Sequence, residues 1–312
     1  MIAFSAAMEP LRLANHVSGR KLYEWDIYSR DGKPVAASNG IELAVSGSLA
    51  DIDPVPMAIV CSGVDVQKYI EKDLISKLRR LVSHGASIGA LCTGAYILAR
   101  AGLLDGYRCT VHWENLIGFR EDFPDIDVTS ELFEIDRNRL TCAGGTAALD
   151  MMLNLIAVQV GHDTAALVAD SMIHHRIRDG REAQRMELRA RLGLSHPKLL
   201  AVISHMEENL EEPLSCAELA AYVGLSTRQL ERLFNKYLNR SPTRYYLGLR
   251  LDRARFLLLQ TSMPILDVAL ACGFVSASHF SKSYREYFGR TPSEERQAPA
   301  NVVPMPRLSA AG

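Results

Sequence analysis

GLSTRQLERLFNKYLNRSP at residues 224–242 and GFVSASHFSKSYREYFGRTP at residues 273–292 decide the fold of the carboxyl end of this chain, because the second stretch repeats the first. Aromatic, leucine, arginine and proline positions recur at a constant offset: Phe234, Tyr237, Leu238, Arg240 and Pro242 match Tyr284, Tyr287, Phe288, Arg290 and Pro292. The second copy has one extra residue near its turn. A solenoid usually needs three or more repeats of about 50 residues, so two copies indicate a pair of similar motifs instead.

The first copy predicts a helix-turn-helix. Ser215 and Glu218 form a capping box, Gly224 supplies the corner, and Ser226 caps a second helix. The spacing of apolar residues predicts one buried face on each helix. We expect these faces to consist of Leu219, Ala220, Tyr222 and Val223 on the first helix, and Leu230, Leu233, Phe234, Tyr237 and Leu238 on the second.

The second copy repeats this pattern after an intervening helix. Pro264 suits a first helical turn, Gly273 supplies the corner, and Phe280, Tyr284, Tyr287 and Phe288 are expected to be buried. Between the copies, residues 244–260 carry apolar residues on one stripe and predict a single helix. Such a strut would hold two recognition helices about one DNA turn apart, ~34 Å.

The exposed faces of the two recognition helices carry side chains that read base edges or hold phosphates. The predicted DNA-binding residues are Thr227, Arg228, Gln229, Arg232, Lys236, Ser278, His279, Ser281, Lys282 and Arg285. From Arg228 to Arg255 there are eight basic and two acidic residues, a local excess that the net charge of -1 conceals. A helical hairpin with a solvated basic face is the alternative, and two copies at matched spacing argue against it.

Residues 197–296 resemble the DNA-binding domain of AraC-type regulators. The resemblance implies double-stranded DNA and RNA polymerase as partners. It also implies that Arg228, Gln229 and Arg232 make most base contacts, while the second helix contributes through Ser278, His279 and Lys282. Ala277 stands where family members often carry a larger side chain, so readout by the second helix is expected to be weaker.

The first 175 residues alternate short apolar runs with helical patterns. The expected strands are Tyr23–Ser29, Met57–Cys61, Ala86–Leu91 and Leu140–Ala143, and the expected helices are Asp65–Ser83, Thr93–Ala101 and Ala147–Val160. This alternation predicts an α/β domain with a mainly parallel, flavodoxin-like sheet and helices on both faces. Residues 176–196 are predicted to be a linker, 197–296 an all-α domain with two helix-turn-helix units, and 297–312 a disordered tail.

SIGALCTGAYILARAGLLDG (87–106) predicts a strand, a sharp turn at Cys92 and a helix whose amino terminus favours a thiolate. With His112 in CTVHWE, Glu9 in SAAMEPLRL and TCAGGTAALDMM (141–152), residues 1–175 resemble the PfpI-like branch of the class I glutamine amidotransferase-like superfamily. Thr93 stands where many PfpI-like hydrolases have histidine. The strand expected ahead of the Glu9 loop is absent, so either the true start lies upstream of Met1 or the chain is truncated.

Three interpretations of Cys92 remain: a buried inert thiol, the nucleophile of a thiol-dependent amidase or hydrolase, and part of a small-ligand pocket. We favour the pocket, because the resemblance to regulators that join these two domains implies a sensor of a small nitrogenous metabolite. Quaternary amines such as carnitine or glycine betaine, and amino acids such as arginine, are the implied effectors. The implied lining is Glu9, Cys92, Thr93, His112 and Trp113. Glu9 would pair with a cation, and Trp113 would either attract it by cation–π contact or pack in the core.

Composition excludes other classes. The six cysteines are far apart and suggest free thiols in a reducing compartment. No apolar run approaches the roughly 18 residues of a membrane span, and the start lacks a signal peptide's basic flank. His174 and His175 are adjacent, and on a helix they would point to different faces and could not jointly bind a metal well. We assign no metal and no cofactor. The resemblance implies a homodimeric regulator of catabolic genes, and with these observations we expect it to be cytoplasmic and not an enzyme. A non-DNA-binding partner protein is a further alternative.

Overall fold

The computed structural model describes residues 1–63, 65–261 and 263–297. Within it the chain forms two compact units, Met1–Gln184 and a second that begins at Arg185. The predicted disordered tail lies outside the described residues, except for Gln297 at the end of a helix.

The first unit is built on a four-stranded sheet in the order β5 (Met57–Ser62), β6 (Ser87–Cys92), β10 (Arg139–Cys142) and β9 (Phe133–Asp136). The first three strands are parallel and β9 is antiparallel to β10. Three of the four expected strands are confirmed with small shifts at their ends. The fourth, Tyr23–Ser29, is wrong over most of its length, because only Tyr28–Ser29 (β1) pairs, with Gly47–Ser48 (β4).

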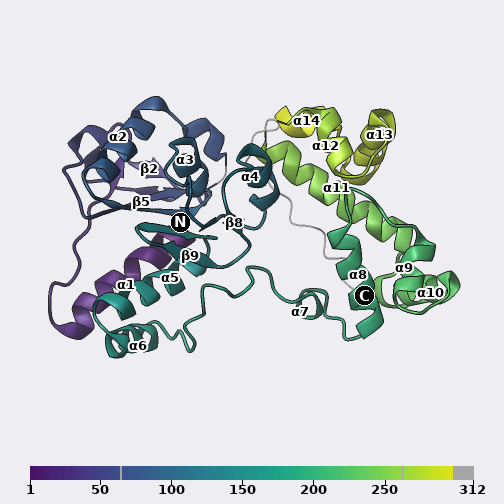
Figure 1. Ribbon diagram of the computed structural model, residues 1–312, viewed down its shortest axis with the longest axis horizontal. Coiled ribbons are helices and arrows are strands. Elements are labelled where there is room, and N and C mark those ends of the chain that lie inside the picture. The colour runs from purple at the N-terminus through teal and green to yellow at the C-terminus, as the bar shows by residue number, and fades with distance from the viewer. Residues whose placement is uncertain (64, 262, 298–312) are drawn as a thin grey trace. The chain divides into compact units, whose positions relative to one another are not determined.

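Helices cover both faces of this sheet (Figure 1). Ile88 and Ala90 of β6 face the core formed with α2 (Lys72–Ser83) and α3 (Gly94–Arg100). Leu91 faces the opposite core, formed with α1 (Ile2–Ser18) and α5 (Ala147–Gln159). Since successive strand residues point to opposite faces, one short apolar run serves both cores. The flavodoxin-like expectation is confirmed.

Shorter elements complete this unit. They are β2 (Val35–Ala36), β3 (Glu42–Leu43), η1 (Leu49–Asp51), η2 (Val66–Tyr69), β7 (Cys109–Thr110), α4 (Leu116–Asp122), β8 (Val128–Thr129) and α6 (His162–Ser171). The helix expected over Asp65–Ser83 is therefore wrong in its first third, where η2 precedes α2.

The loop expected around Glu9 is also wrong, because residues 2–18 form α1. Ala7, Pro10 and Ala14 are buried, at the spacing of one helical face, against α5 and α6. Gly19 ends the helix with a left-handed φ of 63°. Burial of these three residues stabilises the helix despite the proline in its interior. Their helical spacing can be seen in the sequence.

The second unit is helical throughout. Its elements are α7 (Leu188–Leu192), α8 (Pro197–Glu208), α9 (Cys216–Tyr222), α10 (Thr227–Leu238), α11 (Pro242–Gln260), α12 (Ile265–Ala271), α13 (Ala277–Phe288) and α14 (Pro292–Gln297). The Ser215–Glu218 capping box is present, and Ser226, Ser241 and Ser276 each cap the helix that follows. These elements confirm two helix-turn-helix units, α9–α10 and α12–α13, joined by the expected strut α11.

The prediction that three tyrosines lie in the core is wrong. Tyr222, Tyr237 and Tyr287 are 57%, 38% and 42% exposed. Tyr222 stacks on His205 with ring centroids 4.1 Å apart, and Tyr237 lies 5.4 Å from the ring of His196. A tyrosine can cover a neighbouring ring while its hydroxyl stays in water, which a count of apolar positions misses.

Residues 176–196, predicted as a linker, fall partly in each unit. Residues 176–184 belong to the first unit, and residues 185–196 belong to the second. Leu188, Leu192 and Leu194, on and after α7, pack against the core of the second unit. No helix in the described part of the chain is long and apolar enough to span a membrane.

Candidate nucleic-acid interface and effector site

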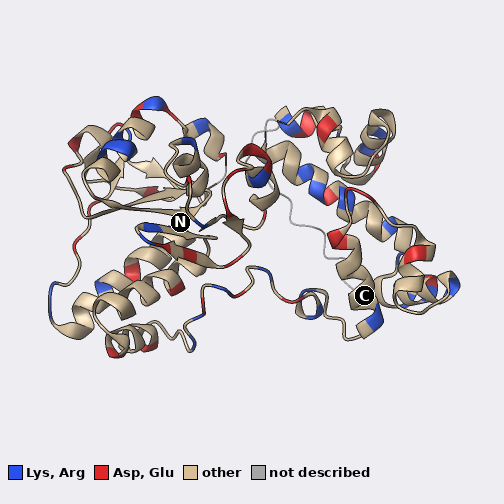
Figure 2. Cartoon of the chain, viewed as in Figure 1, with Lys and Arg blue, Asp and Glu red and all other residues tan. Residues whose placement is uncertain are grey.

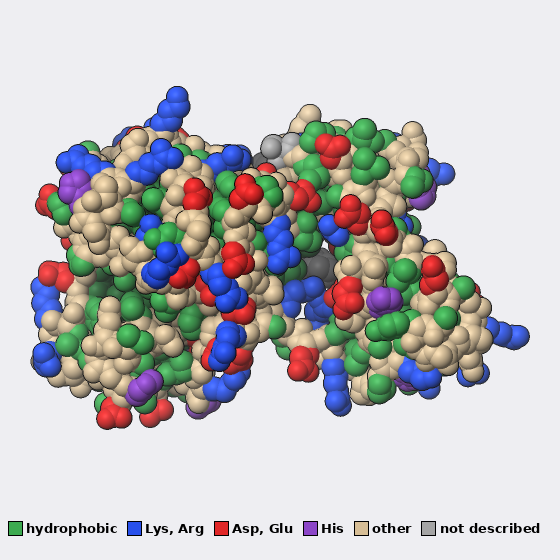
Figure 3. Space-filling model, in the orientation of Figure 1, with side chains coloured by type: hydrophobic (Ala, Val, Ile, Leu, Met, Phe, Trp, Pro, Cys, Tyr) green, Lys and Arg blue, Asp and Glu red, His purple; other side chains and the backbone are tan. Residues whose placement is uncertain are grey.

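Helix α10 presents one charged face to solvent. Leu230 and Phe234 are fully buried and fix its orientation. Thr227, Arg228 and Arg232 are exposed on the other side. Among the described residues, neither arginine has a hydrogen bond or ion pair to an acidic side chain, so both remain available for phosphates or base edges. Figure 2 marks lysine and arginine positions along α10, and Figure 3 shows basic side chains projecting from the surface there.

Gln229, a predicted base reader, is already engaged. Its Oε1 accepts hydrogen bonds from the Ser226 backbone N–H at 2.8 Å and from the Ser226 hydroxyl at 3.0 Å. A bidentate contact to adenine needs both the oxygen and the nitrogen of the amide. Gln229 would therefore have to leave its cap to make that contact, or use its Nε2 alone.

Helix α13 presents a weaker version of the same face. Phe280 and Tyr284 are fully buried, while Ser278, His279, Lys282 and Arg285 are exposed and Ser281 is partly buried. The Lys282 ammonium lies 4.0 Å from the Glu286 carboxylate, which offsets part of its charge. The smaller contribution expected of the second helix stays a prediction.

Helix α11 holds both helix-turn-helix units in one arrangement. The Tyr246 hydroxyl donates to the carbonyl of Asn209, ahead of α9. Four residues later, Arg250 donates from Nε to the Cys272 carbonyl at 2.8 Å and from Nη2 to the Gly273 carbonyl at 2.6 Å. Its guanidinium lies 4.2 Å from the ring centre of Phe274. Side chains of α11 thus form hydrogen bonds both with the turn of the second motif and with the loop that leads into the first.

Gly273 packs the turn of the second motif against the loop that precedes the first motif. Its φ is 74°, and a Cβ there would lie 2.6 Å from Pro213 Cγ and 2.7 Å from the Leu210 carbonyl oxygen. Only glycine fits such a distance and such a φ. The spacing of the recognition helices is therefore set by close packing inside this unit.

Cys92 in the first unit lies at a sharp elbow between β6 and α3. Its φ is 57°, a left-handed conformation that is uncommon for a residue with a side chain. Two glycines make room: a Cβ on Gly94 would lie 2.6 Å from the Val60 carbonyl oxygen, and one on Gly144 would lie 2.7 Å from Cys92 Cβ. The strand, turn and helix predicted around Cys92 are therefore present.

The electrostatics of the elbow do not favour a thiolate. Burial raises the pKa of the Cys92 thiol, and the Glu114 carboxylate raises it further. The Thr93 backbone N–H at the start of α3 lowers the pKa of Cys92, as predicted for a helix terminus, but burial raises it by more. Thr93 cannot serve as a base, and its hydroxyl donates to the Gly63 carbonyl at 2.6 Å.

His112, Trp113 and Glu114 follow β7 and are all partly buried. The rings of His112 and Trp113 have centroids 5.6 Å apart, and His112 Nδ1 lies 3.6 Å from Glu114 Oε2. Burial lowers the pKa of His112 and raises that of Glu114. Sequence reasoning missed Glu114, although it stands two residues after His112 in CTVHWE.

Glu9, unlike Glu114, is paired with a basic side chain. It lies on α1 with its side chain 45% exposed, and its carboxylate pairs with Arg12 at 2.7 Å. The charge predicted to meet a cationic ligand is thus compensated within one helical turn.

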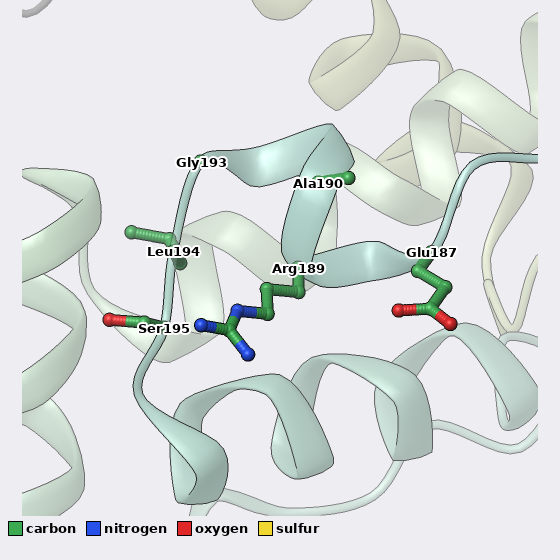
Figure 4. Close-up of a pocket in the computed structure, with 6 residues that line it drawn as sticks. All are labelled: Glu187, Arg189, Ala190, Gly193, Leu194 and Ser195. Atoms are coloured by element: carbon green, nitrogen blue, oxygen red, sulfur yellow. The ribbon is translucent and has the colours of Figure 1, made fainter.

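A shallow hollow of about 380 Å³ lies elsewhere, on α7 and the turn after it (Figure 4). It is lined by Glu187, Arg189, Ala190, Gly193, Leu194 and Ser195. The Glu187 carboxylate lies well apart from the Arg189 guanidinium, and the remaining lining is one hydroxyl and apolar groups. These groups do not converge on a ligand position, so we assign it no site. In the described residues no cluster of histidine, cysteine, aspartate and glutamate could hold a metal ion.

Comparisons with known proteins match both halves. The DJ-1/PfpI family model matches residues 7–158, and a helix-turn-helix domain model matches residues 219–298. The HTH-type transcriptional regulator GbdR of Pseudomonas aeruginosa is 49% identical over 98% of this chain and 85% of its own length. The regulator CdhR of the same species is 44% identical over 97% of this chain and 92% of its own length. A crystal structure of an AraC family transcriptional regulator from Pseudomonas putida, 30% identical, covers 55% of this chain and 92% of that chain, with a TM-score of 0.51.

Proposed function

The chain belongs to the AraC-type HTH transcriptional regulators that carry an amino-terminal DJ-1/PfpI domain, and we propose that a small nitrogenous metabolite bound near Cys92 controls it. As a member of that family it is a sequence-specific DNA-binding transcription regulator. The observation that carries the proposal about DNA contacts is the duplicated recognition helix. Each copy is fixed by two buried residues and exposes basic side chains on the opposite face.

Base reading is assigned chiefly to α10, through Arg228 and Arg232, with phosphate contacts from Thr227 and Lys236. Gln229 contributes if it leaves its cap, and α13 adds Ser278, His279, Ser281, Lys282 and Arg285. Arg232→Ala should weaken operator binding by about 1–3 kcal/mol and relax the preference at one base pair. Arg189→Ala, an exposed arginine on α7, is the matched control. Equal affinities for the two variants would remove α10 from the interface.

The effector is assigned to the elbow, with Cys92, Thr93, His112, Trp113 and Glu114 around it. Glu114 takes the role first predicted for Glu9. Its described ion-pair partner is His112, and burial lowers the pKa of that imidazole, so His112 compensates the Glu114 carboxylate less than an arginine would. A carboxylate beside an indole suits a quaternary amine or the cationic group of an amino acid.

Thermal melting with glycine betaine, carnitine and arginine tests this assignment. A compound that binds the folded protein raises the melting temperature. Glu114→Gln should remove that rise, whereas Glu9→Gln should keep it because Arg12 already neutralises Glu9. The reverse result would return the recognition role to Glu9.

We also propose that Cys92 is part of a sensor and not a nucleophile. The raised pKa of the thiol and the absence of a base at Thr93 support this. Cys92→Ser should therefore keep effector-dependent transcription, and loss of that response together with a measurable amidase activity in the native chain would favour thiol chemistry.

Further partners follow from family membership. We propose a homodimer formed through the first unit, contacts with RNA polymerase, a cytoplasmic location and target genes for catabolism of the effector. Sedimentation at micromolar concentration would test the dimer, and a monomer bound to a full operator would contradict it.

A further inference from the structure

The chain reverses sharply where it leaves α6. Ile173 has a φ of 56°, although a β-branched residue strongly disfavours this region. Its side chain is 77% exposed, so burial does not explain the conformation. Such strain persists only where neighbouring contacts hold the backbone in place. The segment that follows, residues 174–184, supplies those contacts and is called the strap below.

The first anchor of the strap is Asp150, a fully buried carboxylate on α5. It accepts hydrogen bonds from His174 Nε2 at 2.8 Å and from the backbone N–H and Nε of Arg178, both at 2.8 Å. Arg178 Nη2 also donates to the Thr146 hydroxyl at 2.7 Å. Thr146 ends the loop in which Gly144 packs on Cys92, so Arg178 holds one side of the elbow.

The middle of the strap lies beside the residues just before β9 and at its start. The Gly180 carbonyl accepts from the Leu132 N–H at 2.8 Å. A Cβ on Gly180 would lie 2.8 Å from the Phe133 carbonyl oxygen, so only glycine allows this approach. The Glu182 carbonyl accepts from Leu132 as well, at 3.1 Å.

The last anchor is Gln184, the final residue of the first unit. Its Nε2 lies within hydrogen-bond distance of three oxygens: Thr110 Oγ1 at 3.0 Å, the Val111 carbonyl at 3.0 Å and the Glu131 carbonyl at 2.8 Å. Val111 directly precedes His112. Gln184 therefore holds the start of the loop that carries His112, Trp113 and Glu114.

The next residue already belongs to the second unit. The Arg185 guanidinium lies 3.9 Å from Glu207 on α8, and Arg191 pairs with the same carboxylate at 2.6 Å. A single peptide bond thus separates an anchor in the first unit from an anchor in the second.

We propose that the strap is the coupling element of this regulator, which transmits movements of the two elbow loops to the start of the DNA-binding unit. A plain tether would need only one attachment, at any place on the surface. Two of the three anchors instead reach the two elbow loops: Arg178 bonds Thr146, whose loop packs on Cys92 through Gly144, and Gln184 bonds Val111, directly before His112. The proposal rests on the proposed function only in assuming that a ligand at the elbow controls DNA binding.

A first test needs no ligand. Hydrogen exchange is measured on the full chain carrying Gln184→Ala, with the exposed Gln67→Ala in the same unit as control. Loss of the Gln184 contacts should speed exchange in the peptide covering residues 110–116 by about three- to tenfold, the effect of losing one or two hydrogen bonds. Unchanged exchange there would overturn the proposal whether or not any compound binds the elbow.

A second test measures coupling itself. Glycine betaine, carnitine and arginine are used as probes, and reporter transcription is compared with and without whichever raises the melting temperature. Gln184→Ala should keep that rise in melting temperature but lower the induction ratio, the factor by which the compound changes transcription. Coupling between two sites typically amounts to a 5- to 150-fold change, and the variant should lose part of that factor. Gln67→Ala should keep both. A positioning role predicts this separation of binding from response, whereas a merely structural role would lower both together.

The two failures are distinguishable. If no probe raises the melting temperature, the effector assignment fails and the exchange test alone decides the strap. If a probe binds and Gln184→Ala responds like the native chain, the strap is not the coupling element. Should Gln184→Ala fold poorly, Gln184→Glu keeps the size of the side chain and removes the donor, and the same outcomes apply.

Discussion

The two helix-turn-helix motifs have the same plan but differ in how tightly their turns are held. Gly224 at the first corner has open space around the position of a Cβ, and Lys198 approaches its carbonyl at 3.4 Å from an exposed position. Gly273 at the second corner is pressed against Leu210 and Pro213 and is gripped by Arg250 at 2.6 Å. The first motif carries the freer cations and the second carries the tighter packing. The two copies therefore differ in role: the first motif is suited to contacting DNA, and the second to fixing the relative position of the two motifs.

The largest expected effect is at the two corners. Gly273→Ala should destabilise the protein by about 2–5 kcal/mol, because the new methyl overlaps Pro213 and also forces alanine to a left-handed φ. Gly224→Ala meets no neighbour and should cost only about 1–2 kcal/mol for its φ of 63°. Urea unfolding of both variants measures the difference. Equal losses would mean that the two corners are held alike.

The basic side chains that hold the corner carbonyls should show the next difference. Arg250→Ala removes two hydrogen bonds and the contact with Phe274, and should cost about 2–3 kcal/mol. Lys198→Ala removes one long, exposed contact and should cost under about 1 kcal/mol. Thermal melting gives both values, and a larger loss for Lys198→Ala would reverse the comparison.

For operator affinity we expect the opposite order, with a larger loss from a substitution in the first motif than from one in the second. Arg228→Ala should weaken operator binding by about 1–3 kcal/mol, since that guanidinium has no acidic partner among the described residues. Lys282→Ala should cost under about 1 kcal/mol, because Glu286 already offsets its charge. Binding titrations at two salt concentrations check this, and each lost phosphate contact should lower the salt slope by about 0.9. A greater loss for Lys282→Ala would make α13 the main reader.

The smallest effect concerns the helix caps. Ser226 both accepts from Gln229 and is bonded in return by the Gln229 side chain, whereas Ser276 only accepts from His279. Ser226→Ala should therefore cost about 1 kcal/mol and Ser276→Ala about 0.5 kcal/mol. Urea unfolding measures both losses, and equal losses would mean that the two serines cap their helices alike.

Local patterns predicted most of the fold. Three core strands, the helices after them, the strut and both helix-turn-helix units follow from short periodic runs and caps that lie close together in the sequence. The failures have a common cause. Tyr28–Ser29 pairs with a strand 19 residues away, and α1 is stabilised by α5 and α6 at the far end of the unit. Contacts of this kind leave little trace in the residues next to them.

The site was predicted in outline. The elbow at Cys92 is a strand–turn–helix motif, and the exposed cations of α10 follow from helical spacing, so both could be read locally. Glu114 and the pairing of Glu9 with Arg12 could not, since they depend on which side chains meet and which remain partly buried. The same holds for Gln229, whose composition suits a base reader but whose amide caps its own helix.

The sequence by itself determined the two motifs, their order and their basic face, because a recognition helix is specified by residues within one or two turns of each other. Tertiary structure alone decided how firmly each motif is held and where the chain between the units is anchored. Asp150 and Gln184 bond residues 24 to 74 positions away, and Gly273 is squeezed by a loop some 60 residues earlier. Such long-range contacts arise only when the chain has folded, since they depend on which surfaces meet and not on which residues are neighbours.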